Sequence, residues 1–354
     1  MLSPPRPPRL SRRLLPICGL AAVTLLAACG SKTSSSSSSS TTTPSAAKAS
    51  YPVSVQNCGT TLTFAKAPSR AVSNDVNTVE DMLALGLQKR MVGDFGVDDS
   101  GVKGMPAKYK AAFGQVKRVS PDYFTLEPLV AARPDFLFAG WNYGLEVGSP
   151  TLTPTGLKKH GITTLALTES CSHVQKDDKA VSLDAEYTDL ENLGTIFGVR
   201  AKADTLVAQM KAQVASVATK VAGAKPVSVF LYDSGTDSPF TAPGLAMPDA
   251  LIKAAGGTNV FSSLKQSWTS VSWEKVVAAD PDCILINDYD TPTWPAKEKY
   301  LKSFRLTKGL KAVKDDCFFH LRYDQLTPSP QSAASVEAIA KWLHPEAFGL
   351  PPRP

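Results

Sequence analysis

The sequence has few of the side chains that hold transition metals. Its 354 residues include four histidines, His160, His173, His320 and His344, and no two of them have close ligand spacing. It also lacks the short motifs Gly-x-Ser-x-Gly, Gly-x-Gly-x-x-Gly, His-Glu-x-x-His and Cys-x-x-Cys, which are typical of hydrolase, dinucleotide, metalloprotease and redox sites. We therefore expect no resident metal and no catalytic residues.

A basic stripe of the kind that binds nucleic acid is also missing. The net charge is +6, but Arg6, Arg9, Arg12 and Arg13 supply four of these charges, with no acidic residue before Cys29. Only +2 remains from Cys29 onward. No nucleic-acid partner is expected.

The N-terminus has the pattern of an export signal. The four arginines precede an apolar run at residues 14–28 that is too short for a transmembrane helix. Residues 26–30, Leu-Ala-Ala-Cys-Gly, resemble the lipobox of bacterial lipoproteins, which implies cleavage before Cys29 and lipidation of its thiol. Residues 31–47 are rich in Ser and Thr and have little to bury, which predicts a flexible spacer. We expect an exported chain held by lipid at the outer face of the cell membrane, although an ordinary signal with an incidental cysteine is the alternative. The Sec and Tat export routes both stay open.

The chain contains one internal repeat. Residues 125–139 are matched without a gap by residues 272–286, with Val-Ala-Ala-x-Pro-Asp in both copies and the glutamates Glu127 and Glu274 147 positions apart. Each copy predicts a short helix that opens with a hydroxyl N-cap, ends before a proline and leads into a buried parallel strand. Two such units predict two related α/β lobes.

Four cysteines remain after the signal and the lipobox: Cys58, Cys171, Cys283 and Cys317. An even number outside the cytoplasm predicts disulfides, and four cysteines permit three pairings. Cys283 and Cys317 each begin an apolar strand in the second half, while Cys58 and Cys171 both lie in the first half. We predict the pairs Cys283–Cys317 and Cys58–Cys171, with four buried thiols as the alternative.

A long helix is predicted between the two halves. From residue 201 to 222, apolar residues recur at intervals of three and four, which is the helical period and gives a helix ~33 Å long. The predicted domains are a signal at 1–28, a lipidated linker at 29–50, an N-terminal lobe at 51–182, an interlobe segment at 183–222 and a C-terminal lobe at 223–350. Other predicted elements are strands at 53–56, 60–64, 162–167, 227–231 and 317–321, and helices at 79–87, 182–197, 248–255 and 331–343.

Several motifs follow one another in a distinctive order. After the lipobox and spacer come Pro-Ser-Arg-Ala-Val-Ser at 68–73, Leu-Ala-Leu-Gly-Leu at 83–87, the first repeat copy, the long helix, Ala-Gly-Gly-Thr-Asn-Val-Phe at 255–261 and the second copy. This order, from about residue 54 to about residue 343, resembles the iron-siderophore and cobalamin binding proteins of ABC importers. The resemblance implies two Rossmann-like lobes with mainly parallel sheets, joined by one helix, and a ligand held in the cleft between them. We expect a monomer.

The resemblance also implies roles for particular residues. In that family one glutamate on each lobe docks on basic residues of the permease, and this role carries over to Glu127 and Glu274. Both could instead be ordinary first-turn acids that favour the helix dipole.

Cleft candidates are the polar and aromatic residues at or beyond strand ends. Their rings and one arginine suit a large, flat, partly anionic ligand such as a ferric siderophore or a related chelate or corrinoid, with no other cofactor. The candidates are Asp75, Asn77, Trp141, Tyr143, Tyr232, Asp233, Trp268, Tyr289, Arg322 and Tyr323.

Other functions remain as alternatives. A zinc or manganese receptor with the same two lobes would need a cluster of His and carboxylates. A receptor for a deazaflavin-type cofactor precursor would share the same motifs, and an extracytoplasmic enzyme is the least favoured class. The sequence does not name the ligand.

Overall fold

The structure is a computed structural model that describes residues 50–175, 180–289 and 291–353. Residues Ala46–Pro354 form one compact unit. The predicted signal, the lipidation site Cys29 and the spacer up to residue 49 lie outside the described residues. No helix in the described ranges combines the length and the apolar character needed to cross a membrane.

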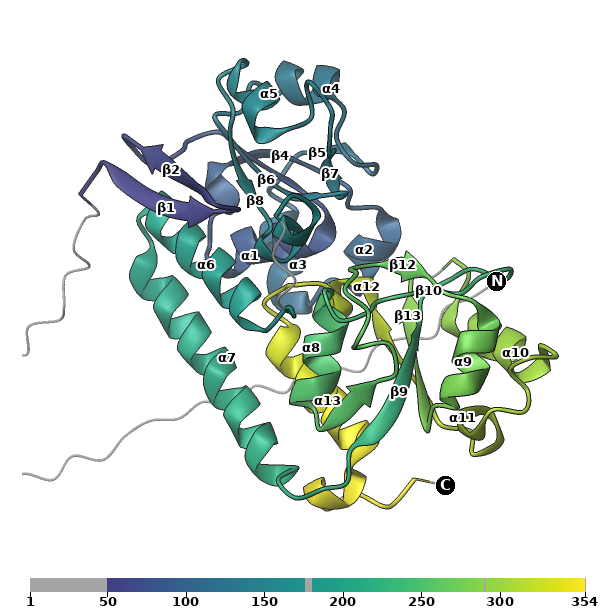
Figure 1. Cartoon of the computed structure of the whole chain (residues 1–354). Coiled ribbons are helices and arrows are strands. Elements are labelled where there is room, and N and C mark those ends of the chain that lie inside the picture. The colour runs from purple at the N-terminus through teal and green to yellow at the C-terminus, as the bar shows by residue number, and fades with distance from the viewer. Residues whose placement is uncertain (1–49, 176–179, 290, 354) are drawn as a thin grey trace, which may run out of the picture. The chain divides into compact units, whose positions relative to one another are not determined.

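The N-terminal lobe, which forms the upper part of Figure 1, is built on a parallel sheet. Its strand order is β5-β4-β3-β6-β8. Because the order reverses between β3 and β6, their carboxyl ends lead away in opposite directions and leave room for a ligand. The strands are β3 (Ala71–Asn74), β4 (Met91–Phe95), β5 (Arg118–Ser120), β6 (Phe136–Trp141) and β8 (Thr163–Ala166), and the short β7 (Gly144–Leu145) pairs with the end of β6. The helices are α1 (Val76–Ala84), η1 (Gln88–Arg90), α2 (Asp99–Gly104), α3 (Ala107–Phe113), α4 (Leu126–Ala131), α5 (Pro154–Lys158) and η2 (Thr168–His173).

The C-terminal lobe repeats this architecture with the parallel order β11-β9-β13-β14. Its order reverses between β9 and β13. The strands are β9 (Val227–Tyr232), β11 (Gly257–Asn259), β13 (Cys283–Asp288) and β14 (Phe318–Arg322), beside a two-stranded antiparallel ladder of β10 (Phe240–Thr241) and β12 (Thr269–Ser270). The helices are α8 (Met247–Ala254), α9 (Trp273–Ala279), α10 (Trp294–Ser303), α11 (Lys311–Lys314), α12 (Tyr323–Leu326), α13 (Ser332–Leu343) and η3 (Pro345–Phe348).

Each sheet is covered by an apolar layer on both faces. Along β6, Phe136 and Phe138 point into one core cluster and Leu137 into another. Along β13, Leu285 likewise packs in one core cluster and Ile284 in another. Successive side chains of a strand alternate between faces, so a strand covered on both sides needs an unbroken apolar run. This is why the two repeats carry such runs after their prolines.

Two helices carry the chain from the first lobe to the second. They are α6 (Asp184–Phe197) and α7 (Arg200–Lys220), which crosses from one lobe to the other in Figure 1. Val207 and Met210 of α7 are buried in the N-terminal core, while Val217 belongs to a C-terminal core. The predicted helix at 201–222 is therefore confirmed within two residues. The predicted lobe boundaries stay a prediction.

The repeat forms the same helix-to-strand unit twice, as α4-β6 and α9-β13. Arg133 and Asp280, one residue before each proline, have positive φ of 47° and 37°. After the prolines, Asp135 accepts hydrogen bonds from the backbone and hydroxyl of Ser69, and Asp282 accepts the same pair from Ser228. Each aspartate thus ties its strand to a neighbouring strand's start.

One predicted N-cap of the repeat is wrong. Ser272 accepts a hydrogen bond from the Lys275 amide, as expected, but the Thr125 side chain caps nothing. A capping oxygen accepts from the second or third amide of a helix, and the third residue of α4 is Pro128, which has no N–H. The same local sequence pattern therefore gives a side-chain cap in only one copy.

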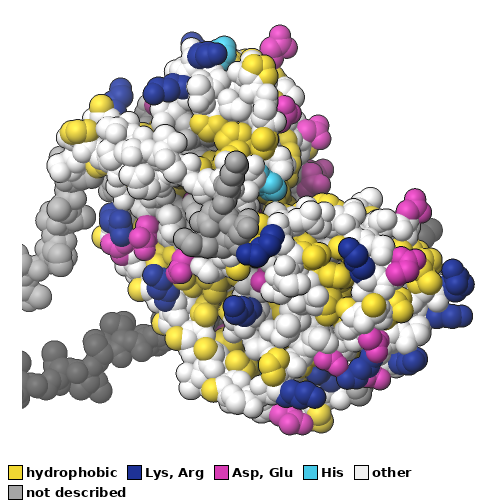
Figure 2. All heavy atoms as spheres, viewed as in Figure 1, with side chains coloured by type: hydrophobic (Ala, Val, Ile, Leu, Met, Phe, Trp, Pro, Cys, Tyr) yellow, Lys and Arg dark blue, Asp and Glu magenta, His cyan; other side chains and the backbone are white. Residues whose placement is uncertain are grey.

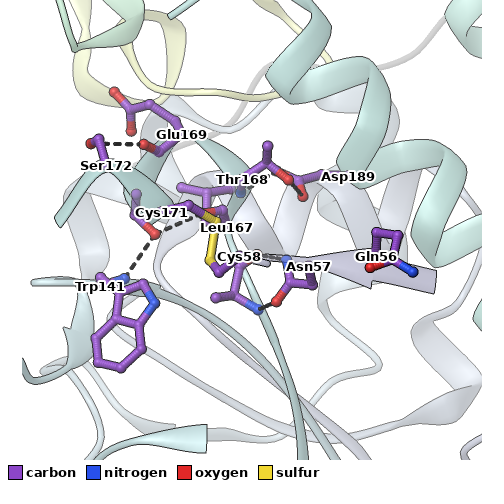
Figure 3. The surroundings of a disulfide bond; sticks show 12 residues. Gln56, Asn57, Cys58, Trp141, Leu167, Thr168, Glu169, Cys171, Ser172 and Asp189 are labelled. Carbon is purple, nitrogen blue, oxygen red and sulfur yellow. Dashed lines mark hydrogen bonds between the residues drawn. A yellow bond between two sulfur atoms is a disulfide. The ribbon is translucent and has the colours of Figure 1, made fainter. Parts of the chain in front are cut away.

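Both predicted disulfides are present, Cys58–Cys171 and Cys283–Cys317. The first fastens η2 to the antiparallel hairpin of β1 (Val53–Asn57) and β2 (Thr60–Phe64). Figure 3 shows Asn57 beside it, whose side chain exchanges two hydrogen bonds with the Ala166 backbone at the end of β8 (2.6 and 2.8 Å). The disulfide and the two hydrogen bonds between Asn57 and Ala166 hold η2 in place, and η2 leads toward the space between the lobes.

Candidate ligand-binding cleft

A cavity of about 500 Å³ lies between the two lobes. The residues that line it follow the carboxyl ends of parallel strands on both sides. In the N-terminal lobe they include Asp75 after β3, Gly96 after β4, Tyr123 after β5 and Tyr143 after β6; in the C-terminal lobe they include Tyr289 after β13 and Arg322 at the end of β14. Open α/β sheets hold ligands at this edge, so the cavity is the candidate site.

Asp75 is the buried centre of the N-terminal side. Its Oδ1 caps α1 by accepting the Val76 amide (2.7 Å), and its Oδ2 accepts the phenols of Tyr123 (2.7 Å) and Tyr323 (2.8 Å). Burial raises the pKa of Asp75 to about 6, against the effect of these hydrogen bonds, which favour the charged form. Since Tyr323 belongs to the C-terminal lobe, this carboxylate joins the lobes beside the cavity.

The backbone around Asp75 is tightly constrained. Asp75 has a φ of 89°, a region that non-glycine residues rarely adopt, and such strain concentrates at functional sites. Gly96 (φ 76°) packs against it: a Cβ there would lie 2.9 Å from the Asp75 nitrogen and 2.8 Å from the Tyr123 ring. Any side chain at position 96 would push Asp75 or Tyr123 out of place.

A second buried aspartate, Asp233, supports the C-terminal side from behind. It accepts hydrogen bonds from Asn287 Nδ2 (2.7 Å) and from the phenol of Tyr289. Lys297 donates to the carbonyls of Asp233 and Asn287 and lies 4.4 Å from the centre of the Tyr289 ring. Burial lowers the pKa of Lys297, while the charge of Asp233 opposes this change. The network holds the Tyr289 ring in position at the cavity.

Among the described residues that line the cavity, the one arginine is already paired. Arg322 Nη2 lies 2.7 Å from Asp324 Oδ2, and Asp324 also accepts from Gln331. Gln331 in turn donates to Glu80 of the N-terminal lobe (2.7 Å). Burial, together with the charge of Asp324, raises the pKa of Glu80 to about 9. This chain of side chains is a second polar link between the lobes.

Aromatic side chains make up much of the remaining lining. Trp268 and Phe240 stack at 6.1 Å with an interplanar angle of 19°, and the rings of Tyr289 and Tyr323 lie 5.8 Å apart. His173, at the end of η2, is 3.1 Å from the side chain of Asn142, and burial lowers its pKa. The cavity therefore offers ring faces from both lobes.

Six of the ten predicted cleft residues line the cavity and four do not. Those at the cavity are Asp75, Tyr143, Trp268, Tyr289, Arg322 and Tyr323.

The four predicted residues that do not line the cavity have other contacts, and their role in ligand binding stays a prediction. Asn77 is buried and donates to the Pro328 carbonyl of the other lobe (2.8 Å). Trp141 packs in the core on one face of the N-terminal sheet, and Tyr232 packs beside Trp273 in a C-terminal core. Asp233 stands behind Tyr289. Each lies near a strand end, but none is among the residues that line the cavity.

The sequence interpretation missed Tyr123, Phe240 and His173. Tyr123 follows β5, which has only three residues, two of them polar, so no strand was predicted before it. Phe240 lies in a two-residue strand and His173 in a 3₁₀ helix. A prediction that included β5 would have found Tyr123 by the same strand-end rule.

The paired glutamates are exposed and lie in the first turns of α4 and α9. Hydrogen bonds from its own amide and from the Ser272 hydroxyl lower the pKa of Glu274. A crossover helix runs antiparallel to its strands, so its N-terminus lies at the same sheet edge as the strand carboxyl ends. Glu127 and Glu274 thus lie on the sheet edges that carry the cavity, one on each lobe.

Side chains of both charges are interspersed on the face shown in Figure 2, where the hydrophobic patches lie between them. Within the described ranges, no group of three or more His, Cys, Asp or Glu side chains is arranged to hold a metal ion.

The fold and cavity define a two-lobed ligand-binding protein, and the chain belongs to the family of periplasmic binding proteins, whose model matches residues 72–324. The match confirms the resemblance drawn from the motif order and the predicted fold class.

Individual proteins agree with this assignment. The chain is 23% identical to the uncharacterized ABC transporter substrate-binding lipoprotein YvrC of Bacillus subtilis, over 93% of this chain and 96% of that protein. It is 27% identical to a cobalamin-binding protein of Halobacterium salinarum, over 67% of this chain and 58% of that protein. The crystal structure of an ABC-type Fe³⁺-hydroxamate transport system from Saccharomonospora viridis superimposes with a TM-score of 0.72 at 23% identity, over 83% of this chain and all of that one.

Proposed function

We propose that this chain is the substrate-binding lipoprotein of an ABC importer, which captures a ferric siderophore or a related chelate or corrinoid and delivers it to the permease. The observation that carries the proposal is the cavity between the lobes, lined by aromatic rings at the reversal points of two parallel sheets. Large apolar rings supply binding area to a bulky ligand, and a few buried polar groups orient it.

The relatives support this function by what their names state. YvrC is named as a substrate-binding lipoprotein of an ABC transporter, and the Halobacterium protein as cobalamin-binding. YvrC matches over nearly its whole length, which fits an exported, lipid-anchored chain with Cys29 as the lipidated residue. We expect the chain to act as a monomer.

A thermal-shift panel tests the ligand class. Ferric siderophores, haem, corrinoids, a deazaflavin, Zn²⁺ and Mn²⁺ would each be added to the purified mature chain. We expect stabilisation by chelates or corrinoids, and its loss in Trp268→Ala. Trp294→Ala is the matched control, because the Trp294 ring stacks on His320 and does not line the cavity. Stabilisation by Zn²⁺ or Mn²⁺ alone would point to the metal-receptor alternative and end this proposal.

We further propose that Glu127 and Glu274 dock on basic residues of the permease. Both are exposed, both lie at the edge of their sheet that carries the cavity, and they occupy equivalent positions of the repeat. Two like charges at matched places on two lobes suit a permease with a matched pair of basic sites.

Charge reversal at both sites separates docking from binding. Glu127→Lys with Glu274→Lys should abolish uptake in cells and leave ligand affinity unchanged. Glu346→Lys, at an exposed position on η3, is the control and should transport normally. Normal uptake by the double variant would refute the docking role.

A further inference from the structure

The charge of the cavity is unusual for an anion receptor. Among the described residues, four carboxylates line it, those of Asp75, Asp98, Asp288 and Asp324, against one guanidinium, that of Arg322. No lysine is among the described residues that line it. Arg322 Nη2 lies 2.7 Å from Asp324 Oδ2, so a neighbouring carboxylate balances the charge of this arginine, while its buried Nε has no hydrogen-bond partner among the described residues.

Of the four tyrosines among the described lining residues, all but Tyr143 add acceptors and not donors. Tyr123 and Tyr323 both donate their phenol protons to Asp75, and Tyr289 donates to Asp233. A phenol has one proton to give, so each of these oxygens keeps only lone pairs for a further hydrogen bond. An anionic ligand, which needs donors, gains nothing from them.

The ring faces have the same electrostatic preference. The face of an aromatic ring carries the negative end of its quadrupole, which attracts cations and disfavours anions. Trp268 and Phe240 present stacked rings at the cavity. Burial lowers the pKa of His173, so this imidazole adds no positive charge at neutral pH.

From these three observations we infer that the cavity selects neutral or cationic ligands and rejects anionic ones. The inference rests on the proposed function and narrows its ligand class. A tris-hydroxamate chelate of Fe³⁺ is neutral, or cationic when it carries an amine, whereas tris-catecholate and citrate chelates are anionic. The hydroxamate type therefore fits this cavity. The partly anionic ligand expected from Arg322 in the sequence is revised, because that expectation did not include the pairing of Arg322 with Asp324.

Two matched ligand pairs test this preference for neutral or cationic ligands, called the charge rule below, on the mature chain. The first pair is the ferric complex of a linear tris-hydroxamate with a terminal amine and the same complex with that amine succinylated, which changes the terminal charge from positive to negative. The second pair is riboflavin and its 5′-phosphate. Quenching of intrinsic fluorescence or titration calorimetry gives the dissociation constants. We expect the amine complex to bind about tenfold or more tighter than the succinylated one, because several carboxylates act on the added charge.

A variant assigns the preference to the cavity. Asp98 caps α2 by accepting the Gly101 amide (2.7 Å), and asparagine can keep that cap while removing the charge. Asp98→Asn should therefore narrow the affinity ratio within the chelate pair by about twofold or more. Asp99→Asn, at a neighbouring and fully exposed side chain, should leave the ratio unchanged.

The outcomes separate this inference from the proposed function. Equal or tighter binding of the succinylated complex or of riboflavin phosphate overturns the charge rule alone. Binding of riboflavin with no binding of either chelate overturns the tris-hydroxamate as the ligand type, while the flavin pair still decides the charge rule. Failure of all four ligands to bind overturns this inference, and the thermal-shift panel with corrinoids and other chelates then decides the proposed function by itself. An equal effect of Asp98→Asn and Asp99→Asn contradicts the cavity as the source of selectivity.

Discussion

The substitution Tyr323→Phe tests the centre of the site most directly. It keeps the ring and removes one of the two phenol hydrogen bonds to Asp75 Oδ2. Burial raises the pKa of Asp75 from 3.8 to about 6, and the phenol bonds limit that rise. A hydrogen bond to a charged group contributes about 1.5–3 kcal/mol. Since 1.36 kcal/mol corresponds to about one pH unit in a pKa, the pKa of Asp75 should rise by about one or more in the variant.

This rise predicts a pH-dependent loss of stability. A carboxyl whose pKa is raised in the folded protein favours the fold when protonated, and that stability is lost as pH increases from the unfolded pKa through the folded one. In the wild type the loss from Asp75 is nearly complete slightly above pH 6. In Tyr323→Phe it continues to higher pH, so the destabilisation should be smallest near pH 5 and grow by about 1.5–3 kcal/mol toward pH 8.

Urea unfolding of wild type and variant between pH 5 and pH 8 measures this change. Tyr51→Phe is the control, because the Tyr51 phenol donates to the neutral Ile196 carbonyl (2.8 Å). Its loss should cost about 0.5–1.5 kcal/mol at every pH in this range. If the cost of Tyr323→Phe were as flat with pH as that of Tyr51→Phe, the account of Asp75 as a carboxylate held by two phenols would be wrong.

Two further predictions concern the whole fold. Replacing Cys58 and Cys171 by alanine should destabilise the chain by up to about 5 kcal/mol, and replacing Cys283 and Cys317 by up to about 4 kcal/mol. The first loss is larger because that disulfide joins residues 113 positions apart, whereas the second joins residues 34 apart. Urea unfolding midpoints measure both losses, and a larger loss for the second pair would contradict the loop-closure argument. Burial raises the pKa of Glu169 to about 7, so the contribution of Glu169 to stability falls as pH rises from about 5 to about 8. In thermal unfolding, Glu169→Gln should therefore reduce the loss of stability with rising pH. An unchanged pH dependence in the variant would exclude Glu169 as its source.

Local sequence signals were sufficient for the repeat unit and for the long helix. Pro134 and Pro281 cannot continue a helix, so the helix ends of both copies could be read from the sequence. The three-to-four spacing of apolar residues in α7 likewise predicted its buried face, which includes Val207 and Met210. The missing cap at Thr125 was also a local matter, since Pro128 removes the amide that corresponds to the Lys275 amide bonded by Ser272 in the other copy.

The disulfide pairs were predictable in part. Cys283 is the first residue of β13 and Cys317 directly precedes β14, and the parallel pairing of these neighbouring strands brings the two cysteines together. The partner of Cys58 was harder to predict, because Cys171 lies in a 3₁₀ helix that the sequence did not indicate. Its pairing depended on the position of the hairpin against β8.

The sequence by itself determined the class of this protein: a duplicated α/β unit, a long connecting helix, an export pattern and a family resemblance that the family match confirms. These features depend on residues close together in the chain. Only the tertiary structure decided which strand-end side chains meet in the cavity. Asp75 and Tyr323 are 248 positions apart, and their hydrogen bond exists only because the strand orders of the two lobes bring the carboxyl ends of β3 and β14 together. The charge of the site depends on the same long-range arrangement, since the pairing of Arg322 with Asp324, and of the phenols with buried aspartates, leaves few donors for an anion.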